Sequence, residues 1–253
     1  MAPSSAAMIE VAGLRVVIPP ANAILDGIDL TVRASEFVVI LGRSGAGKTT
    51  LLRSLNRLVE PTAGSVRVAG RVVTGAGAAD LREARRQTGM IFQQFNLVRR
   101  ASVIDNVLAG RLGYVRALPS LFGRFPPVDR ALALRCLEQV GLGALADRRA
   151  DTLSGGEQQR VAIARALAQE PAVVLADEPT ASLDPALTSS IMDILRRINA
   201  ERGLTLVVSQ HQLETALAYA SRIVGFQRGR VCFDGPPAAV TPAVAAAIYE
   251  DAP

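Results

Sequence analysis

The chain of 253 residues is poor in several residue types, and each shortage narrows its possible functions. It contains two cysteines, Cys136 and Cys232, which lie far apart in different patterns. This is too few for a disulfide framework, and a metal site built on cysteine ligands is not expected, so we expect two reduced thiols in a cytosolic protein. Aromatic residues make up 4% of the chain, and no run mixes them with basic residues, so a nucleic-acid stacking platform is not expected.

Long apolar runs are also missing. No stretch reaches the roughly 18 uninterrupted apolar residues of a membrane-spanning helix. The most apolar zone, 161–176, is interrupted by charged and polar residues and by Pro171. The first residues lack the charged start and apolar centre of a signal peptide. We therefore expect a cytoplasmic protein that does not itself span a membrane.

Basic charge is carried almost entirely by arginine. The chain has 28 Lys+Arg and a net charge of +5, and Lys48 is its only lysine. A basic surface suits a nucleic acid or a membrane face, but we favour arginine-biased codon usage on a solvated surface as the explanation of the charge. With 49% hydrophobic and 20% charged residues, the composition is that of a globular protein with a full core.

The order of apolar patterns predicts an α/β fold. Short apolar runs end at Gly42, at Gln94, at Glu178 and before His211, and helical patterns separate the later ones. Alternating patterns at the start and hairpins at Ala69-Gly70 and Arg228-Gly229 add antiparallel structure. We expect a mostly parallel sheet with an antiparallel β edge subdomain and a helical insertion at about 96–150. The expected single domain covers 8–250.

The clearest chemical signal is "GRSGAGKT", Gly42 to Thr49, between a predicted strand and a predicted helix. It matches the pattern of a phosphate-binding loop in the context that the pattern requires. Its glycines let backbone N–H groups face a β-phosphate, Lys48 reaches the β- and γ-phosphates, and the Thr49 hydroxyl binds Mg²⁺. The sequence therefore predicts a P-loop nucleotide-binding core.

Two carboxylates follow the buried strand "VVLA". Asp177, at the end of that strand, is placed to hold Mg²⁺ through water, and Glu178 to polarise a water that attacks the γ-phosphate. Without a P-loop, two solvated acids before a turn would be an equal interpretation. His211 and Gln93 also follow predicted strands, so both are candidates for a polar task near the γ-phosphate, although either could be solvated.

A second anion-binding pattern lies in "LSGGEQQRVAIARAL". Ser154 and Glu157 have the spacing of a capping box, and two glycines leave backbone N–H groups bare at the helix start. Such a start attracts phosphate because the unpaired N–H groups and the helix dipole point there. A purely structural cap is the alternative. The chain thus has two candidate phosphate sites.

Six short motifs together resemble the ATPases of ABC transporters. They are "GRSGAGKT", "FQQ", "LSGGEQQR", "VVLADEP", "SLD" and "SQHQ", in the order found in that family, over about 10–235. The resemblance implies ATP and Mg²⁺ as ligands. It makes Gln93 the Q-loop residue and a magnesium ligand, 182–184 the D-loop, and His211 the switch histidine. The residues expected to contact ATP are Gly42, Ser44, Gly45, Gly47, Lys48, Thr49, Thr50, Ser154, Gly155, Gly156, Asp184 and Ile18.

The same resemblance explains the two phosphate sites. ATPase domains of this family pair head to tail, so the segment Ser154–Gly156 would meet the γ-phosphate bound by the P-loop of a partner copy. We therefore expect a homodimer in which ATP lies between the chains. One departure concerns Ile18, which stands where the family usually has an aromatic residue stacked on adenine, so stacking is lost and ATP affinity is expected to be lower.

A narrower resemblance concerns cargo. "LNRLVEPTAGSV", "GRLGY", the loop "SLFGRFP" and "FDGPP" look like the ATP-binding subunit of phosphonate importers. This implies a peripheral protein on the cytoplasmic face of the inner membrane, with two membrane permease subunits, an external solute-binding protein and no nucleic acid. The alternatives are an importer of another solute, such as a polar amino acid, and a soluble ABC ATPase that acts on nucleic acid or ribosomes.

Overall fold

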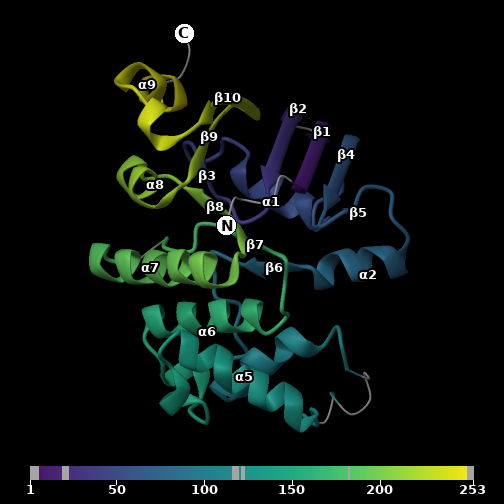
Figure 1. Ribbon diagram of the computed structural model, residues 1–253, viewed down its shortest axis with the longest axis vertical. Coiled ribbons are helices and arrows are strands. Elements are labelled where there is room, and N and C mark those ends of the chain that lie inside the picture. The colour runs from purple at the N-terminus through teal and green to yellow at the C-terminus, as the bar shows by residue number, and fades with distance from the viewer. Residues whose placement is uncertain (1–5, 19–22, 116–119, 121–122, 182, 250–253) are drawn as a thin grey trace.

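The computed structural model describes residues 6–18, 23–115, 120, 123–181 and 183–249 as an α/β protein built on two sheets (Figure 1). The first sheet is antiparallel, with strand order β2-β1-β4-β5. Its strands are β1 (Ala7–Val17), β2 (Ala23–Arg33), β4 (Ala63–Val68) and β5 (Arg71–Val72). The turn between β4 and β5 is the expected hairpin, because Ala69 and Gly70 both have positive φ, as a tight two-residue turn requires.

The second sheet is mostly parallel, with strand order β10-β9-β3-β8-β7-β6. Its strands are β3 (Phe37–Leu41), β6 (Thr88–Ile91), β7 (Val173–Ala176), β8 (Thr205–Gln210), β9 (Arg222–Gln227) and β10 (Arg230–Gly235). Only β10 runs antiparallel to its neighbour, through the expected hairpin at Arg228-Gly229. The predicted α/β fold with an antiparallel edge is confirmed.

The burial of strand β3 on both faces explains why its sequence is a continuous apolar run. Val38 and Ile40 belong to a core shared with the antiparallel sheet, whereas Phe37, Val39 and Leu41 belong to a second core on the opposite face. All five side chains are buried. A strand covered on both faces has no solvent side, so the sequence does not alternate between apolar and polar residues.

The helices cover the faces of the sheets and extend the molecule at one end (Figure 1). They are α1 (Lys48–Leu55), α2 (Ala78–Arg86), α3 (Val103–Leu108), α5 (Pro127–Gln139), α6 (Gly155–Leu167), α7 (Pro185–Arg202), α8 (Leu213–Tyr219) and α9 (Pro242–Tyr249). Short 3-10 turns are η1 (Ala109–Arg111), η2 (Gly143–Leu145), η3 (Ala150–Thr152) and η4 (Pro237–Ala239). Among the described residues, no helix combines the length and the apolar character that crossing a membrane requires.

The helical insertion forms the lower end of the molecule in Figure 1, where α3 and α5 pack against α6. Helix α6 begins after the expected limit of the insertion at about 150, yet it shares one core with α3 and α5. Much of the expected loop before α5, residues 116–119 and 121–122, lies outside the described residues. The limits of domain and insertion stay predictions.

One strand is shorter than predicted. The pattern indicated a strand to Gln94, but β6 ends at Ile91. Its partner β7 ends at Ala176, which pairs with Ile91, and the last bond of this pair of strands runs from the Asp177 N–H to the Ile91 carbonyl at 2.8 Å. Strand β6 therefore ends where its only neighbour in the sheet ends, and Gln93 lies two residues beyond it.

Candidate functional site

The carboxyl ends of three neighbouring parallel strands assemble the candidate site. Strand β8 lies between β3 and β7, with Val208 paired to Val39 on one side and to Ala176 on the other. The glycine-rich loop follows β3, two carboxylates follow β7, and β8 ends with polar residues. Such an edge of an α/β sheet is where ligands bind in this class of fold.

The glycine-rich loop connects β3 to α1, as predicted. Gly47 stands at the N-cap of α1 with φ 103°, in the left-handed region. A Cβ there would lie 2.9 Å from the Leu25 side chain and 3.0 Å from the Ile24 carbonyl oxygen, so only glycine fits. The loop thus turns tightly against β2 and begins α1 with backbone N–H groups that no side chain caps.

Lys48 is folded over this loop. Its ammonium group donates hydrogen bonds to the carbonyl oxygens of Gly42 at 2.7 Å and Arg43 at 2.9 Å, and it lies 3.5 Å from the Glu178 carboxylate. Burial lowers the pKa of Lys48, while the charges of Glu178 and Asp177 oppose that shift. The loop carbonyls and Glu178 hold the ammonium group over the glycine-rich loop.

Asp177 is joined to the loop by a short network. Its carboxylate is 1% exposed, and Oδ1 accepts hydrogen bonds from the Thr49 hydroxyl at 2.8 Å and the Ser209 hydroxyl at 3.0 Å. The Arg53 guanidinium lies 3.9 Å from Oδ2. A buried carboxylate needs such partners, because desolvation without them is costly. The network fixes Asp177 and Thr49 side by side.

Glu178 has a backbone conformation that is uncommon for a residue other than glycine. Its φ is 44°, in the left-handed region, and its N–H donates to the Ser209 hydroxyl at 2.9 Å. Strain of this kind is held by surrounding contacts and is concentrated at functional sites. The turn directs Asp177 toward Thr49 and Glu178 toward Lys48, so the adjacent carboxylates have separate partners.

The donor set of this cluster fits a hard divalent cation. Within the described part of the chain, no group of at least three His, Cys, Asp or Glu side chains forms a metal site. Mg²⁺ does not require one, since it keeps several waters and is commonly held by one or two carboxylates together with substrate phosphates. The hydroxyl of Thr49 and the carboxylate of Asp177 supply the oxygen ligands that such an ion prefers.

The other predicted residues lie further from this cluster. His211 follows β8, and Gln93 follows β6; both side chains are exposed, and neither has a direct bond to Lys48 or Glu178 among the described contacts. Thr50 is partly exposed in the first turn of α1. Ile18 comes directly after β1 and is 46% exposed. The structure therefore brings the P-loop and carboxylates together, and it leaves Gln93 and His211 beyond the ends of β6 and β8, the two strands that flank β7.

Ser154 begins α6 with the predicted capping box. Its hydroxyl accepts from the Glu157 N–H at 3.4 Å, and the Glu157 carboxylate accepts from the Ser154 N–H at 2.8 Å. Gly156 lies against the Leu187 side chain. Asp184 caps α7 by accepting from the Leu187 N–H at 2.9 Å. Ser182, in the expected D-loop, lies outside the described residues. These segments make no described bond to the P-loop of their own chain.

Two polar residues of the site, Ser209 and Gln210, were missed by sequence reasoning. Ser209 bridges Asp177 and Glu178, and the buried Gln210 donates from Nε2 to the Thr180 hydroxyl at 2.8 Å. Both residues lie within the fully buried strand β8. The sequence feature that could have revealed them is a pair of polar residues at the end of a buried apolar run, because buried polar groups need hydrogen-bond partners.

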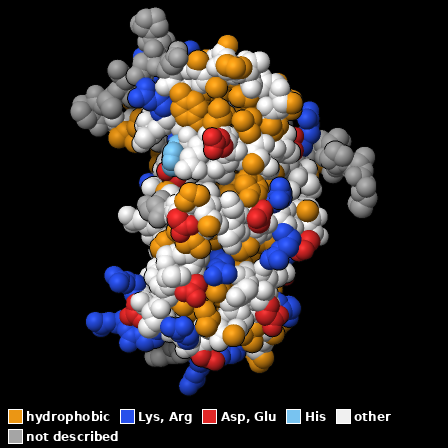
Figure 2. All heavy atoms as spheres, turned by 90° about the vertical axis from the view of Figure 1, so that its left-hand side faces the viewer, with side chains coloured by type: hydrophobic (Ala, Val, Ile, Leu, Met, Phe, Trp, Pro, Cys, Tyr) orange, Lys and Arg blue, Asp and Glu red, His pale blue; other side chains and the backbone are white. Residues whose placement is uncertain are grey.

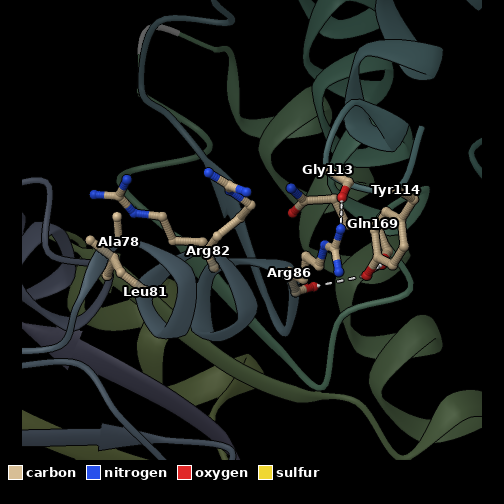
Figure 3. A pocket seen from close by; sticks show the side chains of 8 residues that line it. Ala78, Leu81, Arg82, Arg86, Gly113, Tyr114 and Gln169 are labelled. Atoms are coloured by element: carbon tan, nitrogen blue, oxygen red, sulfur yellow. Dashed lines mark hydrogen bonds between the residues drawn. The ribbon is translucent and has the colours of Figure 1, made fainter. Parts of the chain in front are cut away.

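A separate cleft of about 340 Å³ lies between α2 and the segment after η1. Figure 3 shows Arg82 and Leu81 on one side and Tyr114 with Gln169 on the other. The Arg86 side chain donates to the Gly113 carbonyl, and its guanidinium stacks 5.0 Å from the centre of the Tyr114 ring. Tyr114 belongs to the "GRLGY" motif, and none of the residues lining this cleft belongs to the predicted nucleotide site.

Known proteins resemble the chain over most of its length. The phosphonates import ATP-binding protein PhnC of Shouchella clausii is 51% identical over 242 residues, 96% of this chain and 91% of the relative. Phosphonates import ATP-binding protein PhnC 1 of Rhodopseudomonas palustris is 50% identical over 229 residues, 90% of this chain and 85% of the relative.

Solved structures give the same result for the fold. CbiO1 of Clostridium perfringens, described as part of the ABC transporter complex cbiONQ, matches with a TM-score of 0.80 and 28% identity, over 91% of this chain and 89% of that one. The ATP-binding cassette MJ0796, in a dimeric post-hydrolysis state bound to ADP and Pi, matches with a TM-score of 0.77 and 33% identity, over 91% and 99%. The ABC transporter family profile matches residues 25–181. As its motifs indicated, the chain belongs to the ABC transporter family, with the fold of its ATP-binding cassettes.

Proposed function

We propose that this chain is the ATP-hydrolysing subunit of a membrane importer for phosphonates or related phosphorus oxyanions. One observation carries the ATPase part: Lys48, Thr49, Asp177 and Glu178 converge at the carboxyl edge of the parallel sheet. Support for the cargo is the likeness to proteins named as phosphonate import ATP-binding proteins, at 51% identity over 96% of the chain.

Nucleotide binding is assigned to the glycine-rich loop. Its backbone N–H groups face the β-phosphate, and Lys48 turns from the carbonyls of Gly42 and Arg43 to the β- and γ-phosphates. Ser44, Gly45, Gly47 and Thr50 complete this binding segment. Thr49 and Asp177 would hold Mg²⁺, with Gln93 as a further ligand, and the ion would neutralise phosphate charge when bound.

Hydrolysis is assigned to the residues beyond the strand ends. Glu178 accepts the proton of the attacking water as general base. The 3.5 Å contact with Lys48 holds its carboxylate toward the proposed phosphate site. His211 contacts the γ-phosphate and the attacking water by hydrogen bonding. The water exclusion that such chemistry needs comes from a second chain.

A homodimer completes the site in this proposal. Ser154, Gly155 and Gly156 bind the γ-phosphate held by the partner's P-loop, and Asp184 lies at the same interface. The exposed position of Ser154 supports this, as does the dimeric form of the cassette MJ0796, which is 33% identical. Ile18 covers the adenine by aliphatic contact.

Coupling to transport needs membrane partners. The proposed assembly has two permease subunits above the ATPase dimer and an external solute-binding protein, and it places this chain at the cytoplasmic face of the inner membrane. The cleft between α2 and Tyr114, with its arginines, supports a docking position on the helical insertion. The chain makes no contact with cargo, so the permease and binding protein determine which solute is carried.

The function is tested by reconstituting the chain with its permease and solute-binding protein in vesicles. We expect ATP hydrolysis to rise when the binding protein is loaded with methylphosphonate, and to stay at its basal rate when it is loaded with glutamine. A control with Glu178→Gln should abolish the stimulated rate. Stimulation by glutamine and by no phosphonate would assign the importer to polar amino acids, and hydrolysis stimulated by RNA would assign it to a soluble ATPase.

A further inference from the structure

We propose that Tyr249, in the C-terminal helix α9, is a positioning residue for His211. Its hydroxyl donates a hydrogen bond to the His211 backbone carbonyl at 2.7 Å, and this bond sets the orientation in which the imidazole is presented. The proposal rests on the role given to His211 in hydrolysis, but it adds a residue outside every ATPase motif of the sequence.

The His211 backbone is held from two sides. Its N–H donates to the Gln210 side-chain oxygen at 3.1 Å, and its carbonyl accepts from Tyr249. Gln210 is buried and is fixed through its own bond to Thr180, in the turn that follows Glu178. The His211 side chain is exposed, and the pale blue side chain on the surface in Figure 2 is this only histidine. Its orientation therefore depends on these backbone anchors.

Helix α9 packs against strand β9 through a buried side chain, so it can hold Tyr249 in place. Ile248 is 1% exposed and lies directly over Gly225 in β9. A Cβ at position 225 would lie 2.7 Å from the Ile248 side chain, so strand β9 needs glycine here to admit it. A fully buried isoleucine stabilises the contact through the apolar surface that it removes from water. Glycine at position 225 and isoleucine at position 248 thus fix α9 against the sheet.

The same helix also contacts the phosphate-binding loop. The Arg43 guanidinium, within the glycine-rich motif, donates to the Tyr249 carbonyl at 3.3 Å. The Tyr249 backbone carbonyl therefore accepts a hydrogen bond from Arg43 of the P-loop, and the Tyr249 hydroxyl donates one to the His211 carbonyl. Burial raises the pKa of the Tyr249 hydroxyl to about 12, so it stays a protonated donor at neutral pH. One residue of α9 links two segments of the proposed nucleotide site.

The chain offers a matched control. Tyr219 also donates from its hydroxyl to a backbone carbonyl, that of Ser189 at 3.3 Å, but Ser189 lies in α7 and outside the proposed catalytic residues. Tyr249→Phe and Tyr219→Phe each remove one hydroxyl that donates to a backbone carbonyl, and each keeps the ring. Only the first releases the carbonyl of His211.

The first measurement is steady-state ATP hydrolysis by the full-length chain. We expect Tyr249→Phe to lower kcat roughly 2- to 10-fold, the worth of one hydrogen bond, with KM for ATP unchanged. Tyr219→Phe should keep both values. In a His211→Ala background, Tyr249→Phe should cause no further loss. An unchanged kcat in Tyr249→Phe, or the same fold loss with and without His211, would overturn the inference.

The second measurement does not depend on activity. Because the chain has a single histidine, its imidazole gives one Cε1–Hε1 signal in a ¹H–¹³C spectrum of the nucleotide-free protein. Tyr249→Phe should shift or broaden that signal, and Tyr219→Phe should not. A signal that is identical in Tyr249→Phe and parent would overturn the positioning role. If His211→Ala hydrolyses ATP at the parent rate while the signal shifts in Tyr249→Phe, the catalytic assignment of His211 fails and the Tyr249 contact stands.

Discussion

The loop Gly42–Thr49 and the segment Ser154–Gly156 are both glycine-containing helix starts, and they differ in what surrounds them. The loop is joined to Asp177 through Thr49 and to Glu178 through Lys48, and Ser209 links the two carboxylate residues within the same chain. The Ser154 hydroxyl is exposed, and its described bonds go to Glu157 three residues away. The first region is bonded to the proposed catalytic carboxylates of its own chain, whereas the described bonds of Ser154 serve its own helix cap.

This contrast indicates which substitutions act on chemistry and which act on assembly. Changes around the loop remove groups that are held within about 3 Å of one another, so they should affect hydrolysis directly. Changes at Ser154 should leave the fold of the loop intact, because no described bond joins the two regions. The predictions below separate these effects, beginning with the largest.

The largest effect is expected at Glu178. Glu178→Gln keeps the size of the side chain but removes the base, so kcat should fall roughly 10²- to 10⁴-fold. ATP binding should persist, and the variant should elute as an ATP-bound dimer in size-exclusion chromatography, because closure no longer ends in hydrolysis. The parent with ATP is the control. Hydrolysis near the parent rate would remove Glu178 from the role of general base.

Ser209 should come next. Ser209→Ala removes the bonds to the Asp177 carboxylate and to the Glu178 N–H, and a bond to a buried charge is worth about 1.5–3 kcal/mol. We expect kcat to fall roughly 10- to 100-fold, with a need for more Mg²⁺ to reach half of the maximal rate. Ser221→Ala, which removes a hydroxyl from the opposite end of the same sheet, is the control. Parent-like magnesium dependence in Ser209→Ala would mean that Asp177 needs no such support.

At Ile18 the expected effect is smaller and of opposite sign. If Ile18 covers the adenine, Ile18→Tyr adds a stacked ring, and stacking on a base is worth roughly 1–3 kcal/mol in nucleic-acid sites. ATP binding, measured by calorimetry with Glu178→Gln to prevent turnover, should tighten by about tenfold or more. Ile18→Leu is the matched control and should bind as the parent does. An unchanged dissociation constant in Ile18→Tyr would mean that the base lies elsewhere.

The smallest effect concerns the cap of α6. The hydrogen bonds of Ser154 lower the pKa of Glu157, so the cap stabilises the fold above the ordinary carboxyl range and loses this contribution as pH falls through the lowered value. Ser154→Ala should raise the Glu157 pKa and cost about 0.5–1 kcal/mol of unfolding free energy at pH 7, the low end for exposed caps. Chemical denaturation at pH 7 and below pH 4 measures both. Equal losses of unfolding free energy at the two pH values would contradict a charge-dependent contribution of the cap.

Sequence patterns predicted those parts of the fold and site that local spacing controls. The strand–loop–helix context of Gly42–Thr49 indicated a phosphate loop, and the Ser154–Glu157 spacing predicted the capping box that α6 has. The Arg228-Gly229 turn followed from the same kind of local signal. In each case the residues that decide the conformation lie within a few positions of one another.

Contacts between distant segments could not be predicted in the same way. The end of β6 at Ile91 depends on where β7 ends, and the bridge from Ser209 to Asp177 depends on β8 lying beside β7. The Tyr249–His211 bond joins α9 to the end of β8 across 38 positions. Such contacts depend on which elements lie side by side in the fold, and a short motif contains no information about that arrangement.

The central claim is that Ser154–Gly156 completes the site of a partner chain. Its most direct test mixes two inactive variants, Lys48→Ala, which spoils the loop, and Ser154→Arg, which blocks the segment with bulk and charge. If each ATP site is shared between the chains, one site of a mixed dimer contains both substitutions and the other site contains neither. Differently tagged chains are co-expressed, and mixed dimers are purified through both tags.

We predict that these mixed dimers regain ATP hydrolysis well above either parent variant, or at least close into an ATP-dependent dimer if the two sites must act together. If the segment served its own chain, each chain would carry a broken site and no mixture could repair it. Mixed dimers with neither hydrolysis nor ATP-dependent closure above the parent variants would contradict the account.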